Sequence, residues 1–177
     1  MSSADAMADS VNPPMQKNQP VRFLCDEMLR GLAEWLRVAG YDTRVPDSGT
    51  GDTQVLEQAR VERRYLVTRD RSLAQRARTQ GPEVLLLTTQ GLNANQEELS
   101  RRLSLDWLYR PFSRCKKCNT PLQPCHPDNE PPRQSPTPAI YQCPCCQQAF
   151  WEGSHVRHMR ARLEALNRVG PSHVIES

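Results

Sequence analysis

The sequence contains no long hydrophobic run and no basic N-terminal region followed by an apolar stretch. Its longest apolar run is residues 84–87, far below the roughly 20 residues that a membrane-spanning helix needs. A transmembrane protein is therefore excluded. The N-terminal residues are also unlike a secretory signal, so we expect no membrane association and a cytoplasmic location.

A large excess of charge of one sign is missing as well. The 177 residues include 23 basic and 20 acidic ones, which gives a net charge of +3. This balance excludes a polybasic tail protein but permits nucleic-acid binding through a local patch. The seven cysteines are an odd number, and without a secretory signal they do not indicate a disulfide framework. The positions of the cysteines and of the acids are therefore the informative features.

Apolar periodicity separates a tail from a folded region. Residues 1–20 are polar, contain three prolines and show no periodicity, so we expect a disordered tail. Residues 21–110 alternate between strand and helix patterns. Strands are predicted at 21–25, 41–45, 65–68 and 83–87, and helices at 28–39, from 52, at 72–79 and at 96–103. This alternation predicts an α/β domain with a parallel sheet of four or five strands, covered by helices on both faces.

The composition changes after residue 110. Residues 111–153 hold six of the seven cysteines and most of the prolines. Such a segment cannot bury a core of normal size, so we expect a bound metal to stabilise it. Residues 154–169 have apolar positions at helical spacing with Ser154 as the expected N-cap. We therefore predict a small metal-stabilised module with a C-terminal helix over residues 111–170.

Two pairs of cysteines have the spacing of zinc knuckles. Cys115 and Cys118 form one C-x2-C pair, Cys143 and Cys146 form the other, and 24 residues separate the pairs. Four thiolates suit a tetrahedral zinc ion. Because all four positions would be filled by protein, the zinc is expected to be structural rather than catalytic.

The other cysteines leave some alternatives open. Cys145 lies beside Cys146, but only Cys146 keeps the x2 spacing, so we favour Cys146 as the ligand. Cys125 and His126 lie between the two pairs and are interpreted as loop residues. Cys25 at the end of the first strand is most simply a small buried hydrophobic residue.

Three aspartates occupy comparable places in the predicted sheet. Asp26 follows the first strand, Asp52 opens the second helix, and Asp70 follows the 65–68 strand. The carboxyl ends of parallel strands share one edge, where ligands bind. Converging carboxylates suit Mg²⁺ or Mn²⁺, which can activate water for phosphodiester hydrolysis. The alternative is that Asp52 and Asp70 are only helix N-caps.

Arginines near the acids give modest support for a nucleic-acid substrate. They cluster around Asp70 and on the last helix, where a phosphate backbone could contact them: Arg63, Arg64, Arg69, Arg71, Arg76 and Arg78, then Arg157, Arg160 and Arg162. A solvated helix face is the alternative for each of them.

Several segments together resemble a known family. FLCDEMLRGLAEWLRVAGYDT, LVTRDRSLAQRA, SRCKKCNTPL, CPCC and FWEGSH occur in the order found in the Mut-seven C-terminal RNase domain family. The resemblance covers residues 21–163. It implies a PIN-like three-layer nuclease domain over residues 21–110 with a mostly parallel sheet, followed by a zinc ribbon.

The resemblance also assigns roles to individual residues. By motif, Asp26, Asp52 and Asp70 match three acids of a metal-dependent RNase site, with RNA as the partner. The chain departs from the family pattern at three places. Gly51 precedes Asp52 where adjacent acids are usual, Gln54 replaces a frequent acid, and residues 88–90 (Thr-Thr-Gln) lack a fourth carboxylate.

We therefore expect a metal-dependent endoribonuclease that hydrolyses phosphodiester bonds in single-stranded RNA. It would use a structural Zn²⁺ and a catalytic Mg²⁺ or Mn²⁺. The lack of a fourth carboxylate at residues 88–90 motivates an alternative, a catalytically degenerate PIN-like module that binds RNA or protein. The sequence indicates no oligomeric state.

Overall fold

The computed structural model describes residues 20–125 and 139–170. Its centre is a four-stranded sheet in the order β2-β1-β3-β4. The strands are β1 (Arg22–Cys25), β2 (Asp42–Arg44), β3 (Tyr65–Thr68) and β4 (Val84–Leu86), and all neighbouring pairs are parallel. The predicted parallel α/β architecture is therefore confirmed, with four strands.

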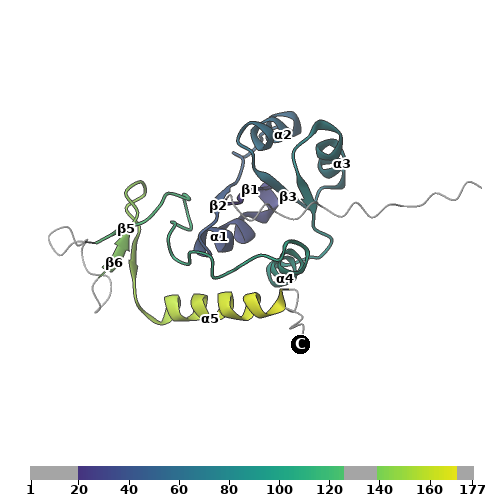
Figure 1. Cartoon of the computed structure of the whole chain (residues 1–177). Helices are drawn as coiled ribbons and strands as arrows, with labels where there is room; N and C mark the ends of the chain where they lie inside the picture. The colour runs from purple at the N-terminus through teal and green to yellow at the C-terminus, as the bar shows by residue number, and fades with distance from the viewer. Residues whose placement is uncertain (1–19, 126–138, 171–177) are drawn as a thin grey trace, which may run out of the picture.

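Helices cover both faces of this sheet (Figure 1). The helices are η1 (Glu27–Leu29), α1 (Arg30–Val38), α2 (Asp52–Val61), α3 (Arg71–Gln80) and α4 (Leu92–Leu103). Side chains alternate between the faces of β3. Tyr65 and Val67 join the cluster of α1 and α4, whereas Leu66 joins the cluster of α2 and α3. Every residue of β3 is buried, which explains why the first three are apolar.

Two helix starts differ from the sequence prediction. Helix α4 begins at Leu92 rather than at residue 96. Its first turns are rich in amides, and Asn95 and Gln96 are buried although they are polar, so apolar periodicity did not reveal them. Helix α2 has Gly51 as its N-cap, and Asp52 is its first residue.

A second sheet and a long helix follow. Strands β5 (Gln123–Pro124), β6 (Ala139–Gln142) and β7 (Ala149–Trp151) form an antiparallel sheet in that order. Helix α5 (Ser154–Val169) then lies beside α4 (Figure 1). Its N-cap is Gly153, not Ser154 as predicted.

Helix α5 shares its core with the parallel sheet. Val156, Met159, Leu163 and Leu166 are buried in the same cluster as α1 and α4. The boundary at residue 110 stays a prediction, but the apolar face of α5 packs on the α/β part. The predicted N-terminal tail up to residue 19 and the loop containing His126 lie outside the described residues.

Candidate functional site

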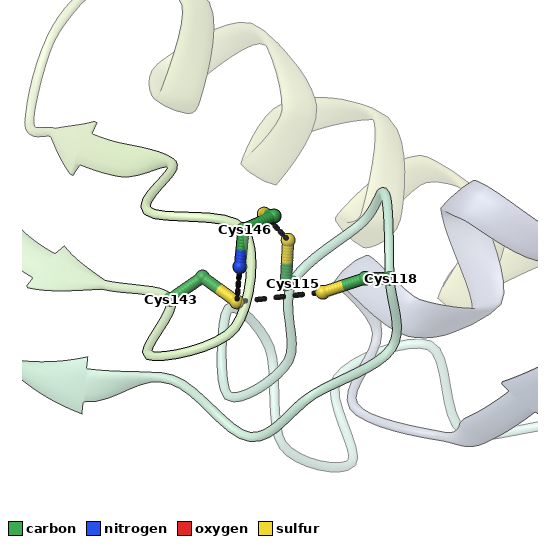
Figure 2. Close-up of side chains that lie close together, drawn as sticks. All are labelled: Cys115, Cys118, Cys143 and Cys146. Carbon is green, nitrogen blue, oxygen red and sulfur yellow. Dashed lines mark hydrogen bonds between the residues drawn. The ribbon is translucent and has the colours of Figure 1, made fainter.

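Four cysteines form a cluster that could hold a metal ion such as zinc. The Sγ atoms of Cys115, Cys118, Cys143 and Cys146 all lie within 4.8 Å of one another. The Sγ–Sγ distances are 3.5 Å between Cys115 and Cys146 and 3.4 Å between Cys118 and Cys143 (Figure 2). Cys145 is exposed and is not part of the cluster. The cluster thus contains Cys146, the ligand favoured by the sequence, and not its neighbour Cys145.

Both cysteine pairs lie on turns with the same backbone pattern. The amide of Asn119 donates to the carbonyl of Cys115, and the amide of Gln147 donates to the carbonyl of Cys143. Asn119 and Gln147 have φ values of 69° and 60°. Asparagine tolerates this left-handed region well, whereas glycine would suit it better than Gln147 does.

The thiols within the cluster have different acidities. Burial raises the pKa of Cys115. Burial also acts to raise the pKa of Cys118, but hydrogen bonds with Thr120 and with neighbouring thiols outweigh it, so the pKa falls below its usual range. Cys118 therefore becomes the thiolate that a metal requires more readily than Cys115 does.

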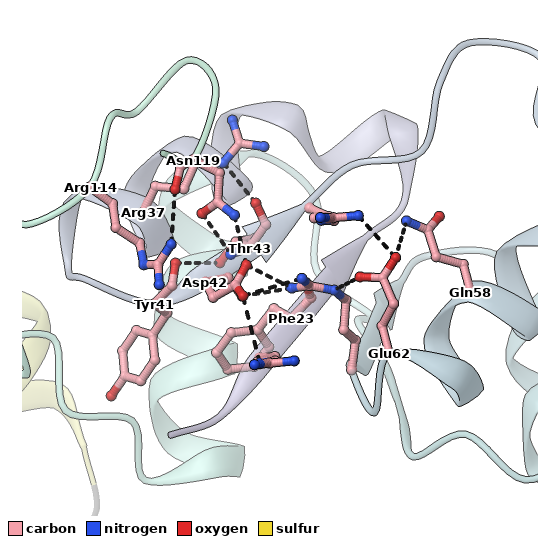
Figure 3. A network of polar contacts seen from close by, with 12 residues as sticks. Phe23, Arg37, Tyr41, Asp42, Thr43, Gln58, Glu62, Arg114 and Asn119 are labelled. Atoms are coloured by element: carbon pink, nitrogen blue, oxygen red, sulfur yellow. Dashed lines mark hydrogen bonds and ion pairs between the residues drawn. The ribbon is translucent and has the colours of Figure 1, made fainter. Parts of the chain in front are cut away.

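The first cysteine turn is attached to the edge strand of the parallel sheet (Figure 3). The buried Arg37 side chain of α1 donates to the carbonyls of Thr43, Lys116 and Lys117 at 2.8, 2.9 and 2.8 Å. The side-chain oxygen of Asn119 accepts from the amide of Thr43 at 3.0 Å. These contacts cover the free edge of β2, and no local sequence pattern indicates them.

Two of the three predicted acids lie at adjacent strand ends. Asp26 follows β1 and Asp70 follows β3, and these strands are direct neighbours. The buried hydroxyl of Thr68 donates to Oδ2 of Asp26 and accepts from the amide of Asp70, both at 2.9 Å. Asp70 also caps α3 by accepting from the amide of Leu73 at 3.0 Å. The alternative N-cap role of Asp70 is thus confirmed, and it does not exclude a second role.

The third acid is held by a different contact. Oδ2 of Asp52 accepts from Arg76 of α3 at 3.0 Å, and both side chains are partly exposed. Within residues 20–125 and 139–170, the three aspartates do not form a group whose ligand atoms lie as close together as those of the four cysteines. Each aspartate side chain uses one oxygen in these contacts and leaves the other without a hydrogen bond to any described residue.

A carboxylate also lies at the end of β4, where the sequence lacks an acid. Glu98 of α4 accepts from the amides and hydroxyls of Thr88 and Thr89 at 2.9–3.2 Å, and it pairs with Arg102 at 3.0 Å. Burial opposes ionisation, but the hydrogen bonds from Thr89, Thr88 and Arg102 lower the pKa of Glu98. Because its oxygens already accept these bonds, Glu98 stabilises the loop that contains Thr88 and Thr89. This role of Glu98 could not be predicted from the sequence, because its threonine partners lie about ten residues away.

The arginines predicted around Asp70 have different roles. Arg64 is buried and binds Asp42 at 2.8 Å and also Glu62. Its interpretation as a substrate-facing residue is therefore wrong, because two carboxylates already surround it. Arg76 lies beside Asp52, as described above. Arg78 is exposed at the far end of α3 from Asp70.

None of the helices in the described parts of the chain is both long and apolar enough to cross a membrane.

Comparison with known proteins identifies the family of the chain. A family model described as Mut7-C RNAse domain matches residues 21–163. No curated protein and no solved structure matches the chain. The matched range contains the whole parallel sheet, the four clustered cysteines and the three aspartates Asp26, Asp52 and Asp70. The chain therefore belongs to the Mut7-C RNAse domain family, whose name describes a nuclease.

Proposed function

We propose that the protein is a metal-dependent ribonuclease that hydrolyses phosphodiester bonds within single-stranded RNA. Membership in an RNase domain family supports this activity. The observation that carries the assignment of the site is the oxygen that each of three aspartates leaves without a hydrogen bond in the described structure. Asp26 and Asp70 directly follow β1 and β3, and Asp52 begins the helix after β2, so all three lie toward the carboxyl side of the sheet, where ligands bind in open parallel sheets.

The carboxylates are the kind of ligand that a hard divalent cation takes. Asp26, Asp52 and Asp70 would hold Mg²⁺ or Mn²⁺, which prefer oxygen ligands. Such an ion supplies activation of water and neutralisation of charge on the leaving oxygen. Thr68 holds Asp26 against the start of α3. Arg76 positions Asp52 and adds a positive charge near the path of the phosphate backbone.

The decisive variant is Asp70→Asn, because asparagine is an equally good N-cap and should keep α3 intact. We expect Mn²⁺-dependent cleavage of labelled RNA to fall on the order of 100-fold, equivalent to about 2.7 kcal/mol of transition-state stabilisation lost with a metal-binding carboxylate. Glu83→Gln is the matched control, since Glu83 is an exposed acid at the opposite end of the strands. Unchanged cleavage by a clean Asp70→Asn preparation would refute this site.

A second candidate function is an RNA- or protein-binding module without activity. It is favoured by Glu98, whose carboxylate is fully used by Thr88, Thr89 and Arg102 and cannot readily complete an acidic site. Labelled single-stranded RNA incubated with Mn²⁺ or with EDTA separates the two functions. Binding without any Mn²⁺-dependent product would favour the binding module.

The cysteine cluster is proposed to bind one structural Zn²⁺. Four thiolates complete a tetrahedral site and leave no position for a substrate or water. A cytoplasmic location would keep these thiols reduced. The zinc therefore has a folding role, and we assign the chemistry of cleavage to the aspartates.

A further inference from the structure

A basic groove lies at the end of the sheet opposite to the acids. It is a cavity of about 200 Å³ between the amino ends of β1 and β2 and the segment 109–114. The side chains that define it are Arg22, Tyr41, Asp42, Tyr109, Arg110 and Arg114. Figure 3 shows Tyr41, Asp42 and Arg114 near one another in this region. The volume is below the roughly 300–1,000 Å³ of small-molecule pockets, so an enclosed metabolite is not the expected ligand.

The groove carries an excess of positive charge. Three arginines line it, and its acid, Asp42, is already bound by the buried Arg64 at 2.8 Å and by Asn119 at 2.7 Å. Burial opposes ionisation of Asp42, but Arg64 and Asn119 lower its pKa. The carboxylate therefore stays charged, and its charge is balanced by Arg64. Arg110 makes no ion pair with any described residue and is exposed. Its charge is available for an anionic ligand.

An aromatic platform forms part of the same groove. Tyr109 is 40% exposed, and its ring stacks on Tyr41 with the centroids 5.0 Å apart and an interplanar angle of 17°. The Tyr41 hydroxyl donates to the carbonyl of Asp106 at 2.9 Å, and this hydrogen bond holds the Tyr41 ring in place under Tyr109. Positive side chains beside a stacked, partly exposed aromatic ring are the two components of surfaces that bind single-stranded nucleic acids.

The backbone holds this platform in place. The amide of Arg110 donates to the carbonyl of Ala39 at 3.0 Å, and the amide of Phe112 donates to that of Val38 at 2.7 Å. Gly40 permits this approach, because a Cβ there would lie 2.4 Å from the carbonyl oxygen of Arg110. Phe112 has φ of 60°, a conformation that bulky residues rarely adopt. The segment is therefore ordered before any ligand arrives, which reduces the entropic cost of binding.

We propose that this groove is an exosite for single-stranded RNA, in which arginines contact phosphates and Tyr109 stacks on a base. The proposal rests on the proposed function, since RNA is taken as the substrate. The four-residue strand β1 separates Arg22 from Asp26, a distance of about 13 Å at ~3.3 Å per residue. Only an RNA several nucleotides long can reach both places, so the exosite should act on long substrates alone.

Binding is measured by fluorescence anisotropy with a labelled single-stranded RNA of about 20 nucleotides in EDTA, so that no cleavage occurs. Arg110→Gln removes a charge without breaking an ion pair, and we expect several-fold weaker binding at low salt. The slope of log K against log[salt] should become shallower by about 0.7. Arg101→Gln is the matched control, because Arg101 is also exposed, lies outside the groove and makes no ion pair with a described residue. Equal effects of Arg110→Gln and Arg101→Gln would overturn the exosite.

Tyr109 provides an independent test of base stacking. Tyr109→Leu should weaken binding about tenfold, because the aromatic face on which a base would stack is lost, whereas Tyr109→Phe keeps the ring and should bind like the wild type. Loss of binding in Tyr109→Phe as well would overturn stacking. Tighter binding of single-stranded DNA of the same sequence would overturn RNA as the ligand. If Arg110→Gln and Tyr109→Leu both bind RNA as tightly as the wild type does, the exosite is rejected. A protein would then be the remaining candidate ligand of the groove.

A cleavage assay separates this proposal from the proposed function. With long RNA, Arg110→Gln should raise KM and leave kcat unchanged, and cleavage of a tetranucleotide should be unaffected. A fall in kcat on both substrates would overturn the exosite. If the wild type cleaves neither substrate, the proposed function is wrong. The anisotropy measurements in EDTA still test whether the groove binds RNA.

Discussion

The guanidinium of Arg37 in α1 donates a 2.8 Å hydrogen bond to the carbonyl of Lys117, which lies between the two cysteines of the first pair. The same side chain reaches the carbonyls of Lys116 and of Thr43 in the edge strand. One buried cation thus connects the α/β sheet with the cysteine cluster. A positive charge here would also complement the excess negative charge that four thiolates would have around a divalent ion.

Arg37→Met should therefore destabilise both parts of the molecule. Three carbonyls lose their donor, and a buried group without a partner costs roughly 1–3 kcal/mol, so we expect a loss of about 2–4 kcal/mol in the free energy of unfolding. Urea unfolding measures it. Arg30→Met is the control on the same helix, because Arg30 is exposed and makes only a 3.6 Å contact with Glu27. A change of less than about 0.5 kcal/mol is expected there. Equal stability of the two variants would contradict the role of Arg37.

The two adjacent cysteines give a matched test of the zinc site. Cys146→Ser should lose the bound zinc and at least about 3 kcal/mol of stability, because metal binding contributes directly to folding. Cys145→Ser should keep about one zinc per chain, since Cys145 is exposed and outside the cluster. Metal analysis and urea unfolding of both variants provide the measurement. Loss of zinc in Cys145→Ser with retention in Cys146→Ser would reverse the assignment.

Removal of metal from the cysteine cluster should also speed hydrogen exchange in the parallel sheet. The amide of Thr43 donates to Asn119, which follows Cys118 in the first turn. When a strong chelator loosens this turn, the amide of Thr43 loses its acceptor, and its hydrogen exchange should become faster. The amide of Leu66 in the central strand β3 donates to the carbonyl of Glu83 and should exchange as before. Unchanged exchange at Thr43 would show that the turn and the sheet are not coupled.

The strands and the cysteine pairs could be predicted from the sequence because their signals are local. Residues 65–68 form a short apolar run, and β3 occupies the same residues. Arg37 could not be assigned, because its partners lie about 80 residues away along the chain. The early start of α4 was hidden because polar residues such as Gln96 are buried there. The acids were placed at one sheet edge by topology, but side-chain contacts such as that between Asp52 and Arg76 are set by packing.

Thr68 is expected to position the proposed catalytic acids. Its hydroxyl contacts both Asp26 and the amide of Asp70. Thr68→Val removes these contacts while keeping the shape, and we expect RNA cleavage to fall about tenfold, equivalent to ~1.4 kcal/mol in the activation barrier. Thr68→Ser retains the hydroxyl and should restore most of the activity. A metal titration of both variants should show that Thr68→Val requires more Mn²⁺. Equal activity of Thr68→Val and wild type at limiting Mn²⁺ would contradict this role.

Glu98 should make stability depend on pH. Its pKa is lowered in the folded protein, so its stabilising contribution is present above the pKa of the unfolded chain, about 4.3, and is lost as pH falls through the lower folded value. At pH 7, Glu98→Gln should cost roughly 1–3 kcal/mol, because one acceptor oxygen facing Thr88 and Thr89 becomes a donor. This difference from the wild type should narrow between about pH 5 and pH 3 in urea unfolding. Glu97→Gln is the control, since Glu97 is more exposed and contacts Arg162 only at 4.0 Å. A deficit of Glu98→Gln that stays constant over this range would show that the carboxylate charge does not stabilise the fold.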